Sequence, residues 1–328
     1  MRTETVEAAL RQPLRLEPRL VAKPWGGQRL GPADPEGPIG EQWQVADLDP
    51  EATSVDRPVT PVATGPLAGA TLRELIAAAP QALLGSARPV QGGFPLLVKL
   101  LDAGQHLSVQ VHPPRGYVDE HPGARLKSES WVVLDAAPGA ELFIGLEDGV
   151  GPGDLRKAAG TPELVPLLRR WPAVPGAVHH LPAGTIHALG AGTLVAEVQT
   201  PSDTTFRLYD WSEEYERAPR GLHVEQALAC VEEAWERNRA SALQPVSGDR
   251  EGALGRTEGY ELARRSLAGQ ATLEPRGGRA EVWCVVAGGL EADGLAGALG
   301  PGDVAVLPAA FDGALRAPAS TQVLTMRP

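Results

Sequence analysis

Four side chains in the first two thirds of the chain have the chemistry to hold one divalent metal ion. Gln110 and His112 lie close together, Glu129 follows them, and His187 ends the segment 182–187. Two imidazoles, one carboxylate and one amide oxygen suit Zn²⁺, and the same ligand types also accept Fe²⁺, Mn²⁺ or Co²⁺. No cysteine lies near them in the sequence, which argues against a structural thiolate site. The residues themselves predict a catalytic metal site and leave the identity of the metal open.

The segment 107–112, LSVQVH, is expected to present two of these ligands from one strand. Successive side chains of a strand point to opposite faces, so Ser108, Gln110 and His112 share a face. A polar row that points into a small barrel is costly unless a metal or polar ligand pairs with it. A row that faces solvent remains the alternative for this segment alone.

A second polar row, Lys127, Glu129 and Trp131, has the same alternation. Its lysine and glutamate could equally form an exposed ion pair, which would contribute little to stability. The segment 182–187, PAGTIH, resembles the P-x-G-x-x-H signature of the cupin superfamily and places His187 after a tight turn. Each piece is weak alone, and their combination favours a metal site.

Three segments at helical periodicity must support these strands. A capping box at Thr71 and Glu74 predicts a helix that starts the insertion 71–85. Apolar residues at helical spacing predict a second insertion over 154–171 and a closing helix over about 224–239. The rest of the chain is typical of short strands separated by Gly and Pro turns.

An internal repeat indicates two copies of one β unit. Residues 175–182 align with 301–308, and residues 129–134 align with 281–286. The copies differ where metal chemistry needs a ligand, because Gly313 occupies the place of His187. If one unit binds metal, it is therefore the first.

The predicted fold is mainly β, with two cupin-type jelly-roll β-barrels and a few helices packed on the catalytic barrel. We expect a catalytic cupin domain over residues 1–240 and a metal-free cupin-like domain over residues 241–328. The polar segment that begins near residue 239 is the expected boundary.

Composition excludes several classes of function. The formal net charge is −11 and no basic stripe is visible, so no nucleic-acid partner is expected. No apolar run is long enough for a membrane span, and the N-terminus does not resemble a signal peptide. Cys230 and Cys284 are far apart and form no CxxC. These features predict a cytoplasmic protein with reduced thiols whose partner is a small molecule.

Several short motifs, in the same order along the chain, resemble those of a known family. The matching segments are Trp25–Gly27, Gly40–Trp43, 95–102, 107–113, Lys127–Trp131, 182–190, 202–210 and Leu222–His223. Together they resemble the short bacterial branch of the type I mannose-6-phosphate isomerases. Just before the 182–190 motif the chain has Gly176-Ala177 where the family often has Gly-Asp, and His179 and His180 are also unusual there.

The resemblance implies an aldose–ketose isomerase that interconverts mannose 6-phosphate and fructose 6-phosphate through a cis-enediol. It implies one Zn²⁺ per chain, held by Gln110, His112, Glu129 and His187, and a catalytic arginine at Arg207. It leaves a monomer and a homodimer equally open.

The proton-transfer group is less well defined by the motifs. Lys127 shares a strand face with Glu129, and Glu197 lies between His187 and Arg207 in the sequence. Either could be the base, and Asp203 is a third candidate. Contacts with the sugar phosphate are expected from Ser108, Lys99, Trp25 and Asp203.

Two other functions remain compatible with the same residues. One is a different metal-dependent cupin enzyme, either another sugar isomerase or an oxygenase that needs Fe²⁺ and O₂. The other is a non-catalytic cupin that binds a sugar phosphate without converting it.

Overall fold

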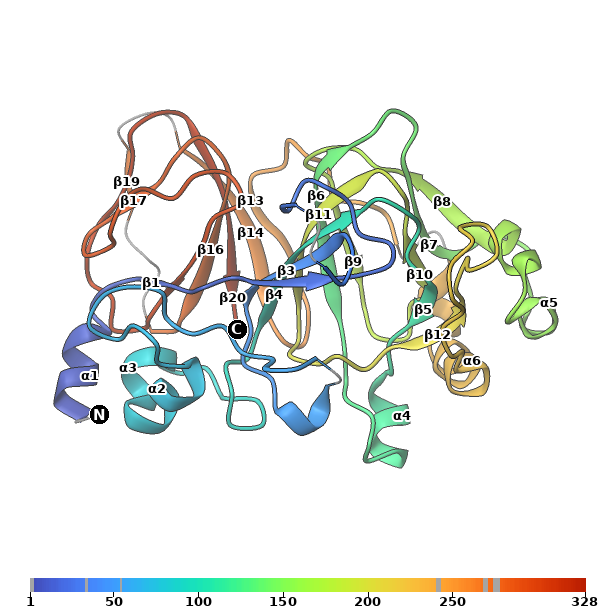
Figure 1. Cartoon of the computed structure of the whole chain (residues 1–328), viewed down its shortest axis with the longest axis horizontal. Helices are drawn as coiled ribbons and strands as arrows, with labels where there is room; N and C mark the ends of the chain where they lie inside the picture. Colours follow the sequence, from blue (N-terminus) through green and yellow to red (C-terminus); the bar gives the residue numbers. More distant parts are fainter. Residues whose placement is uncertain (1–2, 33–34, 54, 240–242, 268–270, 274–277) are drawn as a thin grey trace. The chain divides into compact units, whose positions relative to one another are not determined.

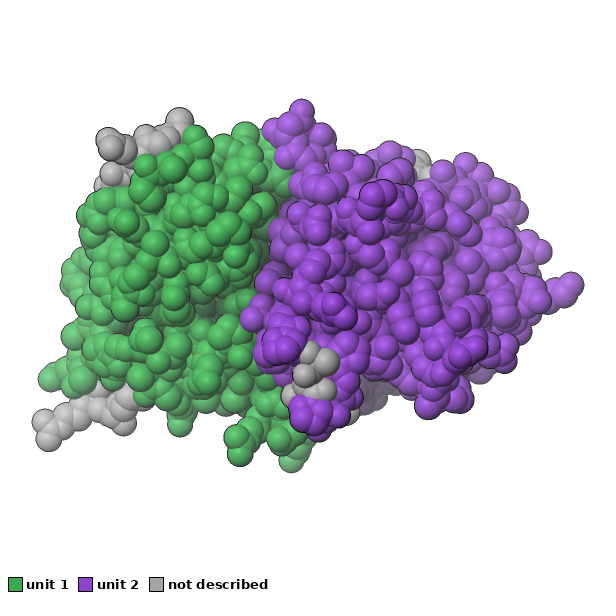
Figure 2. Space-filling view, turned by 45° about the horizontal axis from the view of Figure 1, so that its top comes forward, with its two compact units in different colours: residues 1–19, 43–98, 250–328 green, residues 20–42, 99–249 purple. Residues whose placement is uncertain are grey.

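The protein is described from a computed structural model that covers residues 3–32, 35–53, 55–239, 243–267, 271–273 and 278–328. Its secondary structure is mainly β, as predicted, with short helices (Figure 1). The chain divides into two compact units, coloured separately in Figure 2. Unit 1 comprises residues 1–19, 43–98 and 250–328, and unit 2 comprises residues 20–42 and 99–249.

The two units differ from the predicted domains in which segments they contain. Residues 1–19 and 43–98 group with the C-terminal barrel, so the helical insertion 71–85 belongs to unit 1 and not to the catalytic unit. The pairing of Leu14 with Val306 shows why, because an early strand completes a late sheet. Such long-range pairing has no local sequence signal. The predicted boundary at residues 240 and 241 lies outside the described residues.

Unit 2 contains the strands that carry the predicted metal ligands. One six-stranded sheet has the order β2 (Arg19–Ala22), β3 (Ile39–Val45), β4 (Leu97–Ala103), β11 (Thr193–Gln199), β6 (Glu129–Ala136) and β9 (Val178–Leu181). One five-stranded sheet has the order β12 (Phe206–Tyr209), β5 (Val109–Val111), β10 (His187–Leu189), β7 (Glu141–Leu146) and β8 (Leu168–Pro172).

Apolar residues from both sheets of unit 2 pack into one core, which includes Leu101, Trp131, Ile144 and Leu189. The opposite face of the five-stranded sheet packs against helices, with Leu228 among the buried residues. These elements are α4 (Arg115–Glu120), α5 (Pro152–Ala158), η2 (Pro162–Leu167), α6 (Val224–Glu233) and η3 (Trp235–Asn238). A sheet packed on both faces holds its side chains in fixed positions.

Unit 1 contains the second β unit. Its six-stranded sheet has the order β1 (Leu14–Arg15), β18 (Val304–Leu307), β16 (Glu281–Ala287), β20 (Thr321–Arg327), β14 (Glu261–Leu267) and β13 (Gly252–Arg256). Its three-stranded sheet has the order β15 (Ala271–Leu273), β19 (Leu315–Ala317) and β17 (Glu291–Ala292). The helical elements are α1 (Thr3–Ala9), η1 (Pro50–Ala52), α2 (Leu72–Ala78) and α3 (Pro80–Leu84).

The internal repeat predicted from sequence is confirmed by strand register. In unit 2, β6 pairs with β9 so that Glu129 lies opposite Leu181. In unit 1, β16 pairs with β18 so that Glu281 lies opposite Leu307. The two aligned sequence pairs therefore form the same antiparallel ladder in each unit.

The predicted helices are confirmed in part. Thr71 caps α2 with a complete capping box, in which the Glu74 carboxylate accepts a hydrogen bond from the Thr71 N–H at 2.8 Å. The helix predicted over 154–171 is wrong in its second half, which forms η2 and then strand β8. Pro166 explains the difference, because proline in a helix interior removes a hydrogen bond and clashes with the preceding turn. The closing helix is present as α6 followed by η3.

Among the described helices, none combines the length and the apolar character that a membrane crossing requires.

Candidate metal centre and active site

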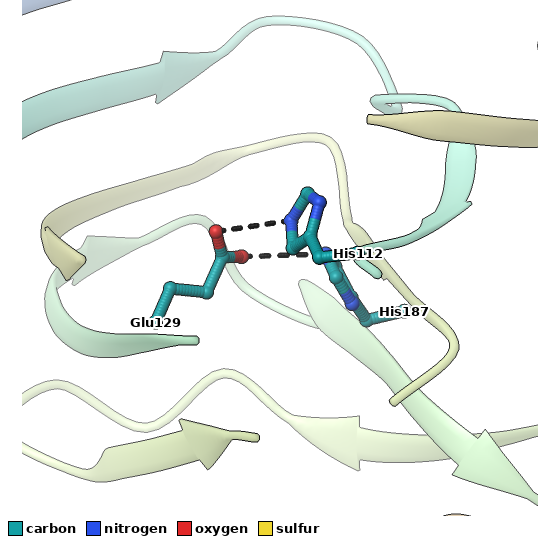
Figure 3. Close-up of side chains that lie close together, drawn as sticks. All are labelled: His112, Glu129 and His187. Carbon is teal, nitrogen blue, oxygen red and sulfur yellow. Dashed lines mark ion pairs between the residues drawn. The ribbon is translucent and has the colours of Figure 1, made fainter. Parts of the chain in front are cut away.

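Three of the four predicted metal ligands converge in the interior of unit 2 (Figure 3). The Nε2 atom of His112 lies 3.1 Å from Oε2 of Glu129, and Nε2 of His187 lies 3.3 Å from Oε1 of the same carboxylate. The potential ligand atoms all lie within 4.8 Å of one another. Ligand distances of about 2.0–2.2 Å to a shared ion are compatible with this spacing.

The ligands come from three strands, and the turn before His187 links two of them. His112 directly follows β5, Glu129 begins β6 and His187 begins β10. Within the turn before His187, the N–H of Gly184 donates to the carbonyl of His112 at 2.8 Å. Gly184 has a φ of +87° and its Cβ, if present, would collide with Ala234, so glycine is required here. The P-x-G-x-x-H pattern thus positions two ligands relative to each other.

A buried asparagine holds the same turn from the closing segment. The side chain of Asn238, in η3, accepts from the N–H of Ile186 at 2.7 Å and donates to the carbonyl of Gly184 at 2.9 Å. Asn238 is fully buried. Sequence reasoning assigned it no role, because only its contacts across many residues reveal its connection to His187.

Both imidazoles direct a lone pair at the cluster. Nδ1 of His112 lies 3.0 Å from the carbonyl of Thr204, and Nδ1 of His187 lies 2.8 Å from the carbonyl of Thr185. Since a carbonyl can only accept, each Nδ1 carries a proton, and in the neutral ring this leaves a lone pair on Nε2. Burial lowers the pKa of His112 to about 3, and the charge of Lys127 contributes in the same direction. Neutral imidazoles anchored in this way are typical of metal-binding histidines.

The cluster fits a cation on its own donor chemistry. Nε2 of His112 and both carboxylate oxygens of Glu129 are buried and make no hydrogen bond of acceptable geometry. Buried polar atoms without a hydrogen bond are rare in folded proteins, and among these three only Oε2 of Glu129 has a positively charged neighbour in the described part of the chain, Nζ of Lys127 at 3.0 Å. A divalent cation at their common focus would satisfy all three atoms. The structure therefore supports a resident metal ion held by His112, Glu129 and His187.

Gln110, the fourth predicted ligand, lies beside this cluster. It pairs with His187 across β5 and β10, and its amide nitrogen lies 3.3 Å from Nε2 of His187. The Ser108 hydroxyl donates to Oε1 of Gln110 at 3.3 Å. Rotating the amide by half a turn would direct Oε1 to the cluster, and Ser108 could then accept from the amide nitrogen. Gln110 can thus supply a neutral oxygen ligand.

Lys127 forms a buried ion pair with the central carboxylate. Its Nζ lies 3.0 Å from Oε2 of Glu129, and both side chains are at most 5% exposed. The alternative reading of this pair as an exposed surface interaction is therefore wrong. Burial alone would raise the pKa of Glu129, but the charge of Lys127 lowers it well below its usual range.

A second buried charge network lies on the six-stranded sheet. Nζ of Lys99 lies 3.6 Å from a carboxylate oxygen of Glu41 and 3.6 Å from one of Glu197. Burial would lower the pKa of Lys99, but the two carboxylates raise it overall. Trp131 donates its indole N–H to Glu197 at 3.0 Å. Glu41 was not singled out from the sequence, although it lies in the Gly40–Trp43 motif.

Arg207 points to the same side as the cluster residues. Arg207 pairs with Gln110 across β12 and β5, and Gln110 pairs with His187 across β5 and β10. Directly paired residues of antiparallel strands project to one face, so these three side chains form a row. Within the described part of the chain, the Arg207 guanidinium makes no hydrogen bond or ion pair, and its Nε is buried without a partner.

The remaining predicted contact residues differ in their surroundings. Asp203 is partly exposed and acts electrostatically on Lys99 and Arg207. Ser108 is 2% exposed and faces Gln110. Trp25 is 3% exposed and packs in the apolar core of unit 2.

Comparison with known proteins identifies the family to which the chain is similar. The family described as "Phosphomannose isomerase type I, catalytic domain" matches residues 14–127. Mannose-6-phosphate isomerase of Streptococcus mutans serotype c is 37% identical over 222 residues, covering 66% of this chain and 67% of the relative. Mannose-6-phosphate isomerase ManA of Bacillus subtilis is 36% identical over 227 residues, covering 67% of this chain and 68% of the relative.

Solved structures extend the likeness over nearly the whole chain. The crystal structure of the mannose 6-phosphate isomerase from Bacillus subtilis has a TM-score of 0.79 at 27% identity, covering 96% of this chain and 99% of that chain. A mutant phosphomannose isomerase from Salmonella typhimurium has a TM-score of 0.70 at 19% identity, with 96% and 99% coverage, and shows the fold alone. By sequence and by fold, this chain belongs to the type I phosphomannose isomerase family.

Proposed function

We propose that this chain interconverts mannose 6-phosphate and fructose 6-phosphate, using one Zn²⁺ held by His112, Glu129 and His187 with Gln110. The observation that carries the proposal is the buried His112/Glu129/His187 group, whose converging ligand atoms fit a divalent cation, in a chain that belongs to this isomerase family. A reaction on a phosphorylated sugar also fits the cytoplasmic location predicted from sequence.

The reaction moves a proton between C1 and C2 through a cis-enediol. The carbon next to a carbonyl is weakly acidic, so negative charge that develops on oxygen must be stabilised. Bound Zn²⁺ supplies Lewis-acid stabilisation of that charge. Neutral histidines and the charged Glu129 suit this role, because they hold a cation without cancelling its charge completely.

Arg207 supplies the second stabilising group in this proposal. Its guanidinium is permanently charged and presents a planar fork of donors. Because it has no carboxylate partner of its own among the described residues, it is available to an enediolate oxygen or to the phosphate. One well-placed donor of this kind contributes about 2.7–4 kcal/mol to transition-state stabilisation.

Lys127 and Glu197 are the proposed proton-transfer groups. Both are buried, at 4% exposure each, and Lys127 contacts the central carboxylate directly. Burial and the charge of Glu129 raise the pKa of Glu197, while Lys99 opposes them. A carboxyl group with a raised pKa can hold and release a proton nearer to neutral pH.

Lys99, Ser108 and Asp203 remain the proposed contacts to the sugar phosphate. Lys99 is already balanced by Glu41 and Glu197, so Arg207 is the stronger candidate for the phosphate itself. Trp25 is proposed to line the site from the core.

A coupled assay of mannose 6-phosphate conversion, with metal content measured on the same sample, tests the proposal. We expect turnover in the purified protein, its loss with EDTA and its return with Zn²⁺ in the absence of O₂. Binding of mannose 6-phosphate without conversion would instead identify a non-catalytic cupin. Activity restored only by Fe²⁺ with O₂ would identify an oxygenase.

A further inference from the structure

The segment from Asp210 to His223 forms a closed loop between β12 and α6 (Figure 1). At its base, the N–H of His223 donates to the carbonyl of Arg207 at 2.8 Å, and the N–H of Arg207 donates to Nδ1 of His223 at 3.2 Å. The two ends of the loop therefore meet next to Arg207, the residue proposed to bind the substrate's negative charge.

Inside the loop, Arg220 binds Asp210 through both its guanidinium and its backbone N–H. Nε of Arg220 donates to Oδ1 of Asp210 at 2.8 Å, Nη2 contacts the same oxygen, and the Arg220 N–H donates to Oδ2 at 3.1 Å. The Asp210 side chain is only 4% exposed. A buried carboxylate held by a guanidinium in this way is a strongly constrained pair.

Arg217, the other arginine at this loop, is committed elsewhere. Its Nη2 donates to the carbonyls of Asp210 and His106, at 2.6 and 3.3 Å, and its Nη1 donates to Gln105 at 3.3 Å. Its nearest approach to the Asp210 carboxylate is 3.9 Å. Arg220 is therefore the main counterion of Asp210.

Arg207 lies three residues before Asp210 in the chain, and its backbone is hydrogen-bonded to His223, three residues after Arg220. Burial lowers the pKa of the Arg207 guanidinium, the charge of Arg220 lowers it further, and Asp210 opposes both. Yet Asp210 binds Arg220 and not Arg207, whose guanidinium has no partner among the described residues. Without Arg220, the Asp210 carboxylate would keep only the 3.9 Å approach of Arg217, whose donors are bound to Gln105 and to two carbonyls. Pairing of this buried carboxylate with the unpaired guanidinium of Arg207 would then be favoured.

We infer that Arg220 is a positioning residue: by neutralising Asp210, it prevents this carboxylate from capturing Arg207, and so keeps Arg207 available to an anionic oxygen of the substrate. The inference rests on the proposed function, since it concerns the same site. The 210–223 loop would then have a second role besides connecting β12 to α6, because its Arg220 neutralises the Asp210 carboxylate that would otherwise bind Arg207.

Charge substitutions at both members of the pair test this inference. In Arg220→Gln, Asp210 should pair with Arg207, so KM for mannose 6-phosphate should rise and kcat/KM should fall by roughly 10- to 100-fold, with bound metal unchanged. Adding Asp210→Asn removes the competing charge and retains an acceptor for the loop N–H. The double variant should therefore recover to within about fivefold of wild type.

Arg169→Gln is the matched control. Arg169 has a similar exposure, 23% against 27% for Arg220, and also pairs with carboxylates in unit 2. It should leave kcat/KM unchanged. If the double variant is as impaired as Arg220→Gln, Arg220 acts only by holding the loop and the inference is wrong. An unimpaired Arg220→Gln would be equally decisive against it.

Two further measurements distinguish the effect of the Arg220 charge from a loss of folding, and test the inference independently of the proposed activity. Arg220→Lys keeps a positive charge beside Asp210 and should retain most of kcat/KM even if Arg220→Gln melts early, and a loss equal to that of Gln would refute the inference. A crystal structure of Arg220→Gln should show Arg207 within ion-pair distance of Asp210. That readout stands even if the wild-type protein fails to isomerise mannose 6-phosphate, and an unpaired Arg207 there would overturn the inference.

Discussion

Replacing Glu129 with glutamine removes one charge from the centre of the proposed metal site and almost nothing else. The carboxylate lies 3.0 Å from Nζ of Lys127, 3.1 Å from Nε2 of His112 and 3.3 Å from Nε2 of His187. Its side chain is completely buried. Glutamine has nearly the same shape, so the packing around it should survive while the electrostatics change.

Two losses should follow from this single change. The metal loses its only anionic ligand, so metal content should fall from about one ion per chain to a small fraction. In the metal-free protein, Lys127 becomes a buried cation without its counterion, which costs about 3–5 kcal/mol when such a pair is broken. For a unit of this size, that corresponds to a fall in melting temperature on the order of 10 °C.

Elemental analysis and thermal unfolding with EDTA measure the two effects separately. Glu141→Gln is the control, because Glu141 belongs to the same barrel but pairs with Arg170 at 41% and 50% exposure. Its melting temperature and metal content should stay near those of wild type, as for other exposed pairs. A Glu129→Gln protein with a full metal complement and an unchanged apo melting temperature would refute the reasoning about this site.

Three further results are expected. His187→Ala should lose metal and activity together while keeping its fold, as judged by circular dichroism; activity with no bound metal would count against the site. Arg207→Ala should keep its metal while kcat falls by about 10²–10³-fold, as expected when one donor to the transition state is removed. Normal turnover of this variant would exclude that role for Arg207. The free energy of unfolding should depend on pH through His179. This side chain is 2% exposed, and neither ring nitrogen makes a hydrogen bond among the described residues. Burial and, to a smaller extent, His180 lower its pKa from 6.5 to about 4. Because the unfolded chain takes up this proton first as pH falls, stability present above pH 6.5 should be lost progressively toward pH 4, by about 2 kcal/mol at pH 5. Thermal melts of His179→Phe from pH 7 to 5 should show a smaller loss than wild type; an equal loss would remove His179 as the cause.

Much of the candidate site follows from local sequence pattern. Strand alternation predicts that Gln110 and His112 share one face and that Lys127 and Glu129 share another, and a glycine turn predicts where His187 emerges. The repeat and the missing histidine at Gly313 indicate which unit would hold a metal. All of these are short-range features, in which the period of the backbone decides the direction of a side chain.

Other features depend on which distant segments meet. The sequence did not indicate that residues 1–19 and 43–98 belong with the C-terminal unit, because that grouping depends on pairing between strands far apart in the chain. Pro166 changed the second half of a predicted helix into a short 3₁₀ turn and a strand. Neither outcome can be read from hydrophobic periodicity.

The sequence by itself determined the ligand types, the faces they occupy and the family to which the chain belongs. Only the tertiary structure decided that the Lys127–Glu129 pair is buried, that Glu41 joins Lys99, and that Arg220 occupies Asp210 while Arg207 stays unpaired. The physical reason is that a residue's type and strand period are local properties. Burial and the choice of a charge partner depend on strand register and loop closure across the whole fold.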